Sequence, residues 1–330
     1  MRYYTLTIVS PQGQVLKTWT SLTALGVNNP NAQNIQFDAI VSPYDTPAGA
    51  QTLTVEGVSL EDLQQAQNFV GSNAILTGGM TKGLPLAQPS QAGLLTAGLV
   101  YQSFGNWIGT DMTLEFVLVP SEFTVSVPGG FMFSWKAGQT LAQALKATFS
   151  AVYPDLSVAI NISPNLVLNY DVHHLCKTLS SLARFVKSIT STMNIAPGYQ
   201  GVSITVQGGL IDVYDGTVSI PAIQLDFPDM IGQPTWIEAA TFQVKLVLRG
   251  DLRVGSQVKM PKELSTLGGG LGLVTSLAAA FPSRLKYKST FQGTFLVREM
   301  RHVGNFRDPD GSSWVTILNC IPTLPPQAAS

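Results

Sequence analysis

The sequence predicts a mainly β protein in which an α+β middle domain lies between two β domains. Three observations predict this class: apolar and polar residues alternate in many short segments, glycine, proline and asparagine interrupt these segments, and few segments have helical spacing. A period of two residues is typical of strands that bury one face and expose the other, as in antiparallel sheets. With 330 residues, the chain is also too long for a single hydrophobic core.

Alternating strands are predicted from the first residues to the last third of the chain. The sequence opens with a strand at residues 1–8, and further strands are predicted at residues 52–56, 113–118, 202–206 and 242–249. A polar turn of sequence Asp308-Pro309-Asp310-Gly311 predicts a hairpin near the C-terminus, because aspartate in such turns accepts hydrogen bonds from the turn backbone.

Three segments with apolar residues at every third or fourth position predict helices. The first follows Ser59, whose hydroxyl can cap it, and reaches Phe69. The second begins at Thr140 and is stopped by Pro154. The third and longest carries its apolar stripe over residues 175–193. These elements divide the chain into a β domain at residues 1–122, an α+β domain at 123–222 and a second β domain at 223–330.

Charged residues are scarce, at 12% of the chain against roughly 25% in an ordinary soluble domain. Interface cores are depleted in lysine, glutamate and aspartate, so this composition indicates a protein that works inside an assembly. The net charge of −1 excludes a protein that binds phosphates through clustered cations, and no sequence-specific nucleic acid is expected as a partner.

The few charges are distributed unevenly. Residues 1–120 carry three basic and seven acidic residues, residues 121–225 carry five of each, and residues 226–330 carry eleven basic and eight acidic residues. An acidic N-terminal third and a basic C-terminal third favour head-to-tail association between copies or docking on different neighbours. Chance variation in such small numbers is the alternative.

Possible metal ligands gather at Asp171, His173, His174 and Cys176. In a helix the two histidines would point about 100° apart, and no second ligand pair accompanies them. We therefore expect the start of a helix here, with a metal site or a Cys–His nucleophile as alternatives. No phosphate-binding loop or hydrolase motif occurs, so neither an enzyme nor a cofactor is expected. Two cysteines favour free, buried thiols over a disulfide framework.

A glycine-rich segment without charges spans residues 264–283. Its strongly apolar part is too short to cross a bilayer, so a loop is favoured over a spanning helix. A loop of this length is uncommon unless it is functional. Its apolar contact candidates are Leu271, Leu273, Val274, Leu277 and Phe281.

The last third also carries a recognisable order of motifs: a strand, the turn Gly250-Asp251 and a strand entered through Val254-Gly255, then a strand containing His302, a polar turn and a strand opened by Trp314. This order resembles the C-terminal barrel of tail or baseplate hub proteins of contractile-tailed bacteriophages. Residues 137–141 with the helix after them resemble the insertion domain of the same family, and residues 55–62 and 102–110 resemble other phage tail sequences.

The resemblance implies two tube-like β-barrel domains that flank a helix-containing insertion domain. It also implies a homotrimer in the virion tail or baseplate, assembled in the host cytoplasm, whose pseudo-sixfold ring joins the tail tube or a tube-initiator protein to the central spike. Other baseplate proteins would be neighbours, and the loop at 264–283 would face the lumen or the tape measure protein. Polar contacts between subunits would come from Arg249, Asp251, Arg253, Arg298, Arg301 and His302.

Two other functions compete with this hypothesis. One is a tail-associated cell-wall hydrolase that uses the histidine and cysteine cluster or a pair of glutamates. The other is a secretion-system or pore-forming component that contacts a membrane through the loop at 264–283.

Overall fold

The computed structural model describes residues 1–45, 51–80, 91–120, 130–238, 240–261, 275–276, 291 and 293–323, and confirms a mainly β fold with few helices. The strands are β1 (Arg2–Val9), β2 (Val15–Thr20), β3 (Asn34–Val41), β4 (Gln51–Glu56), β5 (Asn73–Met80), β6 (Gly93–Ile108), β7 (Asp111–Pro120), β8 (Phe131–Trp135), β9 (Ser157–Asn161), β10 (Val172–Cys176), β11 (Ser203–Gln207), β12 (Leu210–Tyr214), β13 (Ile223–Gln224), β14 (Thr235–Trp236), β15 (Phe242–Val247), β16 (Gln257–Lys259), β17 (Thr275–Ser276), β18 (Thr294–Asn305) and β19 (Trp314–Pro322). The α-helices are α1 (Leu60–Gln64), α2 (Leu141–Val152) and α3 (Leu179–Ser191).

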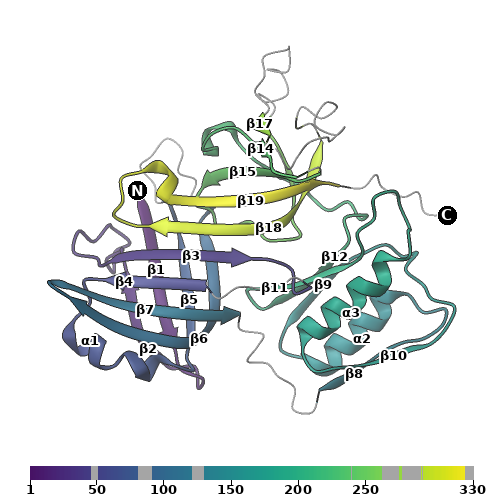
Figure 1. Ribbon diagram of the computed structural model, residues 1–330, viewed down its shortest axis with the longest axis horizontal. Coiled ribbons are helices and arrows are strands. Elements are labelled where there is room, and N and C mark those ends of the chain that lie inside the picture. The colour runs from purple at the N-terminus through teal and green to yellow at the C-terminus, as the bar shows by residue number, and fades with distance from the viewer. Residues whose placement is uncertain are drawn as a thin grey trace.

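One large sheet contains strands from both the N-terminal and the C-terminal parts of the sequence. In the described residues its strand order is β17-β14-β15-β19-β18-β3-β4-β7-β6-β5-β1-β2, with β16 beside β18 and β13 beside β16. The link is the antiparallel pair β3–β18, in which residues 36–41 lie opposite residues 300–305 (Figure 1). The two β regions expected from the sequence are therefore joined by main-chain hydrogen bonds.

Three groups of buried apolar residues lie along this architecture. The first is built from residues 4–118 together with Leu248 and Trp314, the second from residues 131–213 together with Tyr44, and the third from residues 214–320. We refer to residues 1–120, 130–222 and 223–323 as the first β region, the middle region and the second β region. The domain limits at 122 and 222 stay a prediction.

The middle region packs two helices between small sheets. The antiparallel pair β8–β10 and the sheet β11-β12-β9 contact α2 and α3. Helix α2 begins at Thr140 and ends before Pro154, as predicted, with Thr140 and Gln143 forming a capping box. The start predicted for the third helix is wrong. Leu175 lies in strand β10, and α3 begins only after Thr178, whose hydroxyl accepts a hydrogen bond from the Ser181 backbone N–H.

The predicted helix after Ser59 is present but short. Ser59 accepts a hydrogen bond from the Asp62 backbone N–H and caps α1, and a 3₁₀ turn continues the chain to Phe69. The Phe69 ring packs edge-on against Trp19 and Phe116, which lie on two strands of the first β region. Burial of this aromatic cluster holds the short helix against the sheet.

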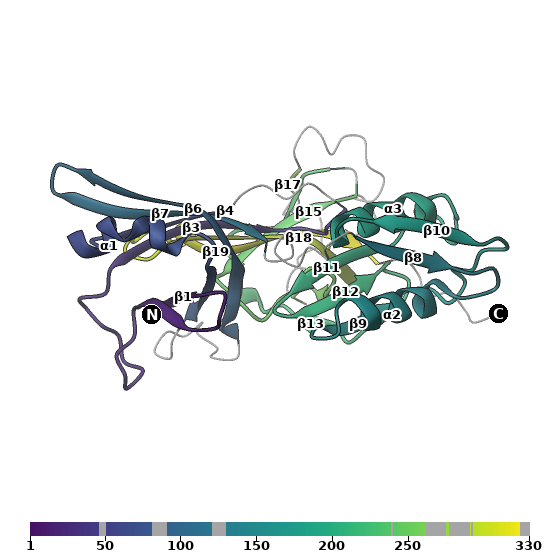
Figure 2. The ribbon, with the colours of Figure 1, turned by 90° about the horizontal axis from the view of Figure 1, so that it is seen from below.

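Strands β6 and β7 form a hairpin that extends beyond the rest of the sheet. They pair up to Ile108 and Asp111, whereas the neighbouring strand β4 pairs with β7 only as far as Thr113. The end of this hairpin and the β8–β10 pair lie at opposite ends of the molecule's longest axis (Figure 1 and Figure 2).

Of the glycine-rich segment at 264–283, the structure describes only Thr275 and Ser276, which form β17 beside β14. The five apolar contact candidates predicted there lie outside the described residues. Among the residues that the structure describes, no helix is long and apolar enough to cross a membrane.

Candidate interaction surfaces

Arg249 is buried at the junction of the two β regions, with 3% of its surface exposed. It follows β15, and its guanidinium group contacts Asp251 at 2.7 Å and Asp229 at 3.4 Å. The Gln91 side chain, from the first β region, donates to the same Asp229 carboxylate at 2.5 Å. Burial raises the pKa of Asp229, while the hydrogen bond from Gln91 and the charge of Arg249 lower it. This network therefore joins the two β regions inside one subunit.

The next residue, Gly250, touches the first β region through its backbone. Its N–H donates to the Gln91 carbonyl at 2.8 Å. A Cβ atom at Gly250 would lie 2.5 Å from the Gly93 carbonyl carbon, and a Cβ atom at Gly93 would lie 2.6 Å from the Gly250 oxygen. The two backbone segments approach closely here only because neither residue has a side chain.

His302 is fully buried in β18, between β3 and β19. Its Nδ1 atom lies 2.9 Å from the Thr316 hydroxyl, which also bonds the Arg249 backbone N–H and carbonyl. Its Nε2 atom is buried without a hydrogen-bond partner. Burial lowers the pKa of His302 from 6.5 to about 4, so the ring is neutral at pH 7.

This burial makes stability depend on pH. The unfolded chain takes up a proton on His302 near pH 6.5, whereas the folded chain resists it down to about pH 4. The contribution of neutral His302 to the free energy of unfolding is fully present above pH 6.5. It is lost as the pH falls from 6.5 towards 4, and the total loss is about 3 kcal/mol. Urea unfolding between pH 7 and 5 should show this slope, and H302Q should reduce it. The exposed His173, changed in H173Q, is the control and should leave the slope as it is.

The remaining predicted interface residues lie nearer the surface. Arg301 forms a two-bond ion pair with Asp38 across the β3–β18 pair, and both side chains are partly exposed. Arg298 lies 4.0 Å from Glu238, with half of its side chain exposed. The structure thus divides the six predicted residues: Arg249 and His302 face the interior of the subunit, while the other four reach its surface or lie close to it.

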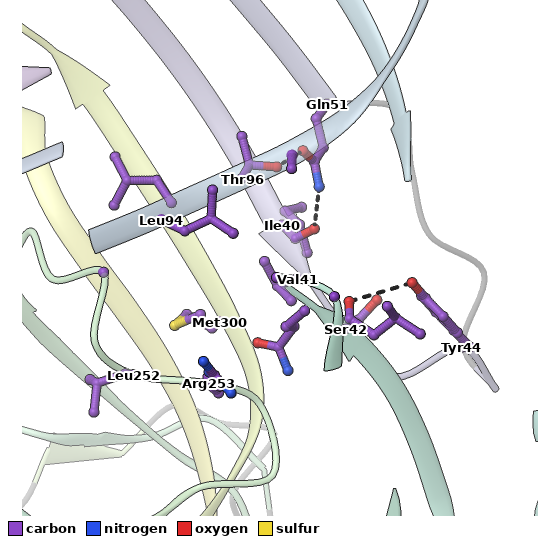
Figure 3. Close-up of a pocket in the computed structure, with 17 residues that line it drawn as sticks. Ile40, Val41, Ser42, Tyr44, Gln51, Leu94, Thr96, Leu252, Arg253 and Met300 are labelled. Atoms are coloured by element: carbon purple, nitrogen blue, oxygen red, sulfur yellow. Dashed lines mark hydrogen bonds between the residues drawn. The ribbon is translucent and has the colours of Figure 1, made fainter. Parts of the chain in front are cut away.

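Arg253 lines a cavity of about 250 Å³ where the three regions meet (Figure 3). The cavity walls come from the end of β3, the start of β6, the β11–β12 turn, the segment after β15 and strand β18. Ile40, Leu94 and Leu252 give it apolar surface, and Gln51 donates to the Ile40 carbonyl at 2.9 Å beside it. The walls combine apolar side chains with the Arg253 cation and with polar side chains such as those of Thr96 and Gln207.

The residues of the predicted histidine and cysteine cluster lie on one strand, β10, and do not come together in the folded chain. Successive side chains of a strand point to opposite faces. His173 is exposed and lies 2.9 Å from the Ser134 hydroxyl, whereas the His174 ring stacks on Phe185. Cys176 is fully buried, and burial raises the pKa of its thiol, which disfavours the reactive thiolate. The described residues contain no group of three or more His, Cys, Asp or Glu side chains able to hold a metal ion. Both cysteines are free and buried, as predicted.

The exposed apolar residues of the β6–β7 hairpin form a surface that the sequence pattern does not predict. Tyr101, Phe104, Trp107 and Ile108 are between 43% and 77% exposed. The available signal was a long run of residues without any charge, from 93 to 110, that contains apolar side chains on both strand faces. The sequence pattern does not show that β4 ends before the hairpin tip, and this is why both faces of β6 are exposed there.

The whole-chain fold is similar to that of a known tail protein. The 43 kDa tail protein of prophage MuSo2 from Shewanella oneidensis matches 98% of this chain and 98% of its own length, with a TM-score of 0.51 and 10% sequence identity. The chain has the fold of a phage tail protein. This agreement confirms, at the level of the fold, the resemblance carried by the sequence motifs.

Two further structures match with TM-scores of 0.48. One is the tail protein from Neisseria meningitidis MC58, at 10% identity over 96% of each chain. The other is the Escherichia coli c3393 protein, described as a type VI secretion system component similar to bacteriophage T4 tail proteins, at 9% identity over 88% of this chain and 73% of its own. No protein-family model and no curated protein sequence matches the chain.

Proposed function

We propose that the chain is a structural hub protein of a phage tail or baseplate. Three copies form a pseudo-sixfold ring that joins the tail tube, or a tube-initiator protein, to the central spike. The observation that carries this proposal is the match to a tail protein fold over almost the whole of both chains. Low charge supports it, because a subunit that buries much of its surface against neighbours needs few ionised side chains.

The internal arrangement of the subunit supports a ring-forming role. Two β regions per chain supply six β units in a trimer, and the β3–β18 pair fixes the two regions of each chain relative to each other. The Arg249 network and the Gly93–Gly250 contact act at the same junction. In this proposal Asp251, Arg253, Arg298 and Arg301 contribute polar contacts between subunits, and the tape measure protein and other baseplate proteins are further partners. The ring is assembled in the host cytoplasm and resides in the virion tail.

Sedimentation velocity of the purified full-length chain tests this function. We expect a species with three times the mass of one chain, and a ring in negative-stain electron micrographs. A monomer at every concentration, or lysis of peptidoglycan by the chain, would contradict a structural hub. If the chain lyses peptidoglycan, C176A tests whether the Cys176 thiol is responsible. Because this thiol is buried away from solvent, the variant should lyse peptidoglycan like the original chain.

A further inference from the structure

The end of the β6–β7 hairpin presents an apolar surface that the subunit itself does not cover. This hairpin tip consists of Phe104 and Ile108 on one face of β6 and Trp107 on the opposite face, with exposed fractions of 43%, 77% and 65%. The Trp107 indole N–H donates to the Gly109 carbonyl at 2.9 Å, which holds the ring at the turn. Large aromatic and aliphatic side chains gathered at one projecting point are typical of a contact surface between proteins.

Two acidic residues of β7 border the hairpin tip. Asp111 and Glu115 are exposed on β7, and Glu115 accepts a hydrogen bond from the Asn106 side chain at 3.1 Å. No lysine or arginine occurs between residues 83 and 135. A partner surface should therefore be apolar with a basic border.

Such a surface lies on the outer face of the β8–β10 pair, here called the ribbon face. Met132 and Leu175 lie opposite each other in its register and are 56% and 58% exposed. The next pair on the same face is Ser134 and His173. The alternate residues of both strands, such as Phe133, point inward to the core with α2 and α3.

One lysine stands at each end of the ribbon face. Lys136 follows β8 and Lys177 follows β10, and both are exposed. Because the two strands are antiparallel, their C-terminal ends lie at opposite ends of the ribbon. The carboxylate next to Lys136, that of Asp171, accepts a hydrogen bond from the Ala137 backbone N–H at 2.8 Å.

We infer that the hairpin tip of one copy docks on the ribbon face of a second copy of this chain. Apolar side chains meet apolar side chains, and Asp111 and Glu115 approach the two lysines. Contact of two tips would place acid against acid, and contact of two ribbon faces would place lysine against lysine. Since the two surfaces lie at opposite ends of the longest axis (Figure 2), the contact is heterologous, and a ring forms when its rotation closes. The inference rests on the proposed ring function and names the contact that builds the ring.

Two surface variants of the full-length chain test this contact by sedimentation velocity. The tip variant carries Trp107→Ser and Ile108→Ser, and the ribbon variant carries Met132→Ser and Leu175→Ser. Each should weaken self-association by at least roughly 30-fold, as loss of a central contact residue does. An equal mixture should form a heterodimer, because it retains one intact tip and one intact ribbon face. Leu25→Ser, at a 90% exposed position outside both surfaces, is the matched control and should associate like the original chain.

A charge exchange tests the borders of the two surfaces. Asp111→Lys with Glu115→Lys should weaken association, and adding Lys136→Glu with Lys177→Glu to the same chain should restore it. All the changed side chains are exposed, so circular dichroism and the melting temperature should stay those of the original chain.

The outcomes separate this inference from the proposed function. A trimer that persists in both surface variants, or a charge exchange without rescue, would overturn the docking contact and leave the ring function standing. Loss of association in one surface variant alone would indicate contact of like surfaces and would also overturn it. An original chain that stays monomeric at all concentrations would overturn both.

Discussion

Replacement of Gly250 with alanine should destabilise the folded chain by about 3 kcal/mol, an effect at the upper end of core overpacking. The added Cβ atom would lie 2.5 Å from the Gly93 carbonyl carbon and 2.7 Å from its Cα and N atoms. All of these atoms belong to the backbone of β6, so no side chain can rotate away and the strand itself must move. Urea unfolding followed by tryptophan fluorescence measures the loss.

The reciprocal change, Gly93→Ala, should have a similar effect because its Cβ atom would meet the Gly250 oxygen at 2.6 Å. Gly311→Ala is the matched control: no atom lies within 4 Å of its Cβ position, and we expect a change of at most about 0.5 kcal/mol. Equal stabilities of Gly250→Ala and Gly311→Ala would contradict this prediction, because the backbone at Gly93 would then move aside at little cost in free energy.

Replacement of Arg249 with alanine should cost about 3–5 kcal/mol, because it leaves the buried carboxylate of Asp229 without its counter-charge. The Asp229 side chain is only 2% exposed and already has its pKa raised by burial. Without the guanidinium group the pKa of Asp229 should rise further. The stability that R249A loses relative to the original chain should therefore become smaller as the pH falls through that raised pKa, since protonation removes the unpaired charge. Unfolding at several pH values measures both effects.

Two comparisons make this prediction specific to burial. Arg298→Ala removes a cation whose side chain is 50% exposed and lies 4.0 Å from its partner, and should cost at most about 1 kcal/mol. Arg249→Met combined with Asp229→Leu should recover part of the loss, because no unpaired charge then remains at Asp229. A loss in R249A no larger than in R298A would contradict the buried network.

Local patterns in the sequence predicted most elements because their causes are local. The alternation at Leu114, Phe116 and Leu118 reports the two faces of one strand, and Ser59 and Thr140 each cap a helix through a backbone N–H three residues away. The turn at residues 308–313 is also as predicted, with the side chains of Asp308 and Asp310 accepting hydrogen bonds from backbone N–H groups two residues on. The start of the third helix was misplaced because Leu175 and Leu179 fit helical spacing by coincidence, although a capping threonine lies between them.

The candidate surfaces were harder to predict, since exposure depends on distant segments. Arg249 reads as a surface charge in sequence, yet Asp229 and Gln91 surround it in the folded chain. Conversely, nothing near Trp107 and Ile108 in the sequence indicates that they are exposed, because strand β4 stops pairing before it reaches the end of the hairpin. Charge content predicted that much of the surface meets other proteins, but it could not locate that surface.

The sequence by itself determined the mainly β class, the positions of most strands and helices, the scarcity of charge and the likeness to tail proteins. Only the tertiary structure decided that one sheet joins the two β regions, through residues 36–41 and 300–305, and that the hairpin tip and the ribbon face lie at opposite ends. The physical reason is distance along the chain. Strand period and helix caps depend on neighbours within a few residues, whereas the pairing of residues 36–41 with residues 300–305 depends on contacts between segments more than two hundred residues apart.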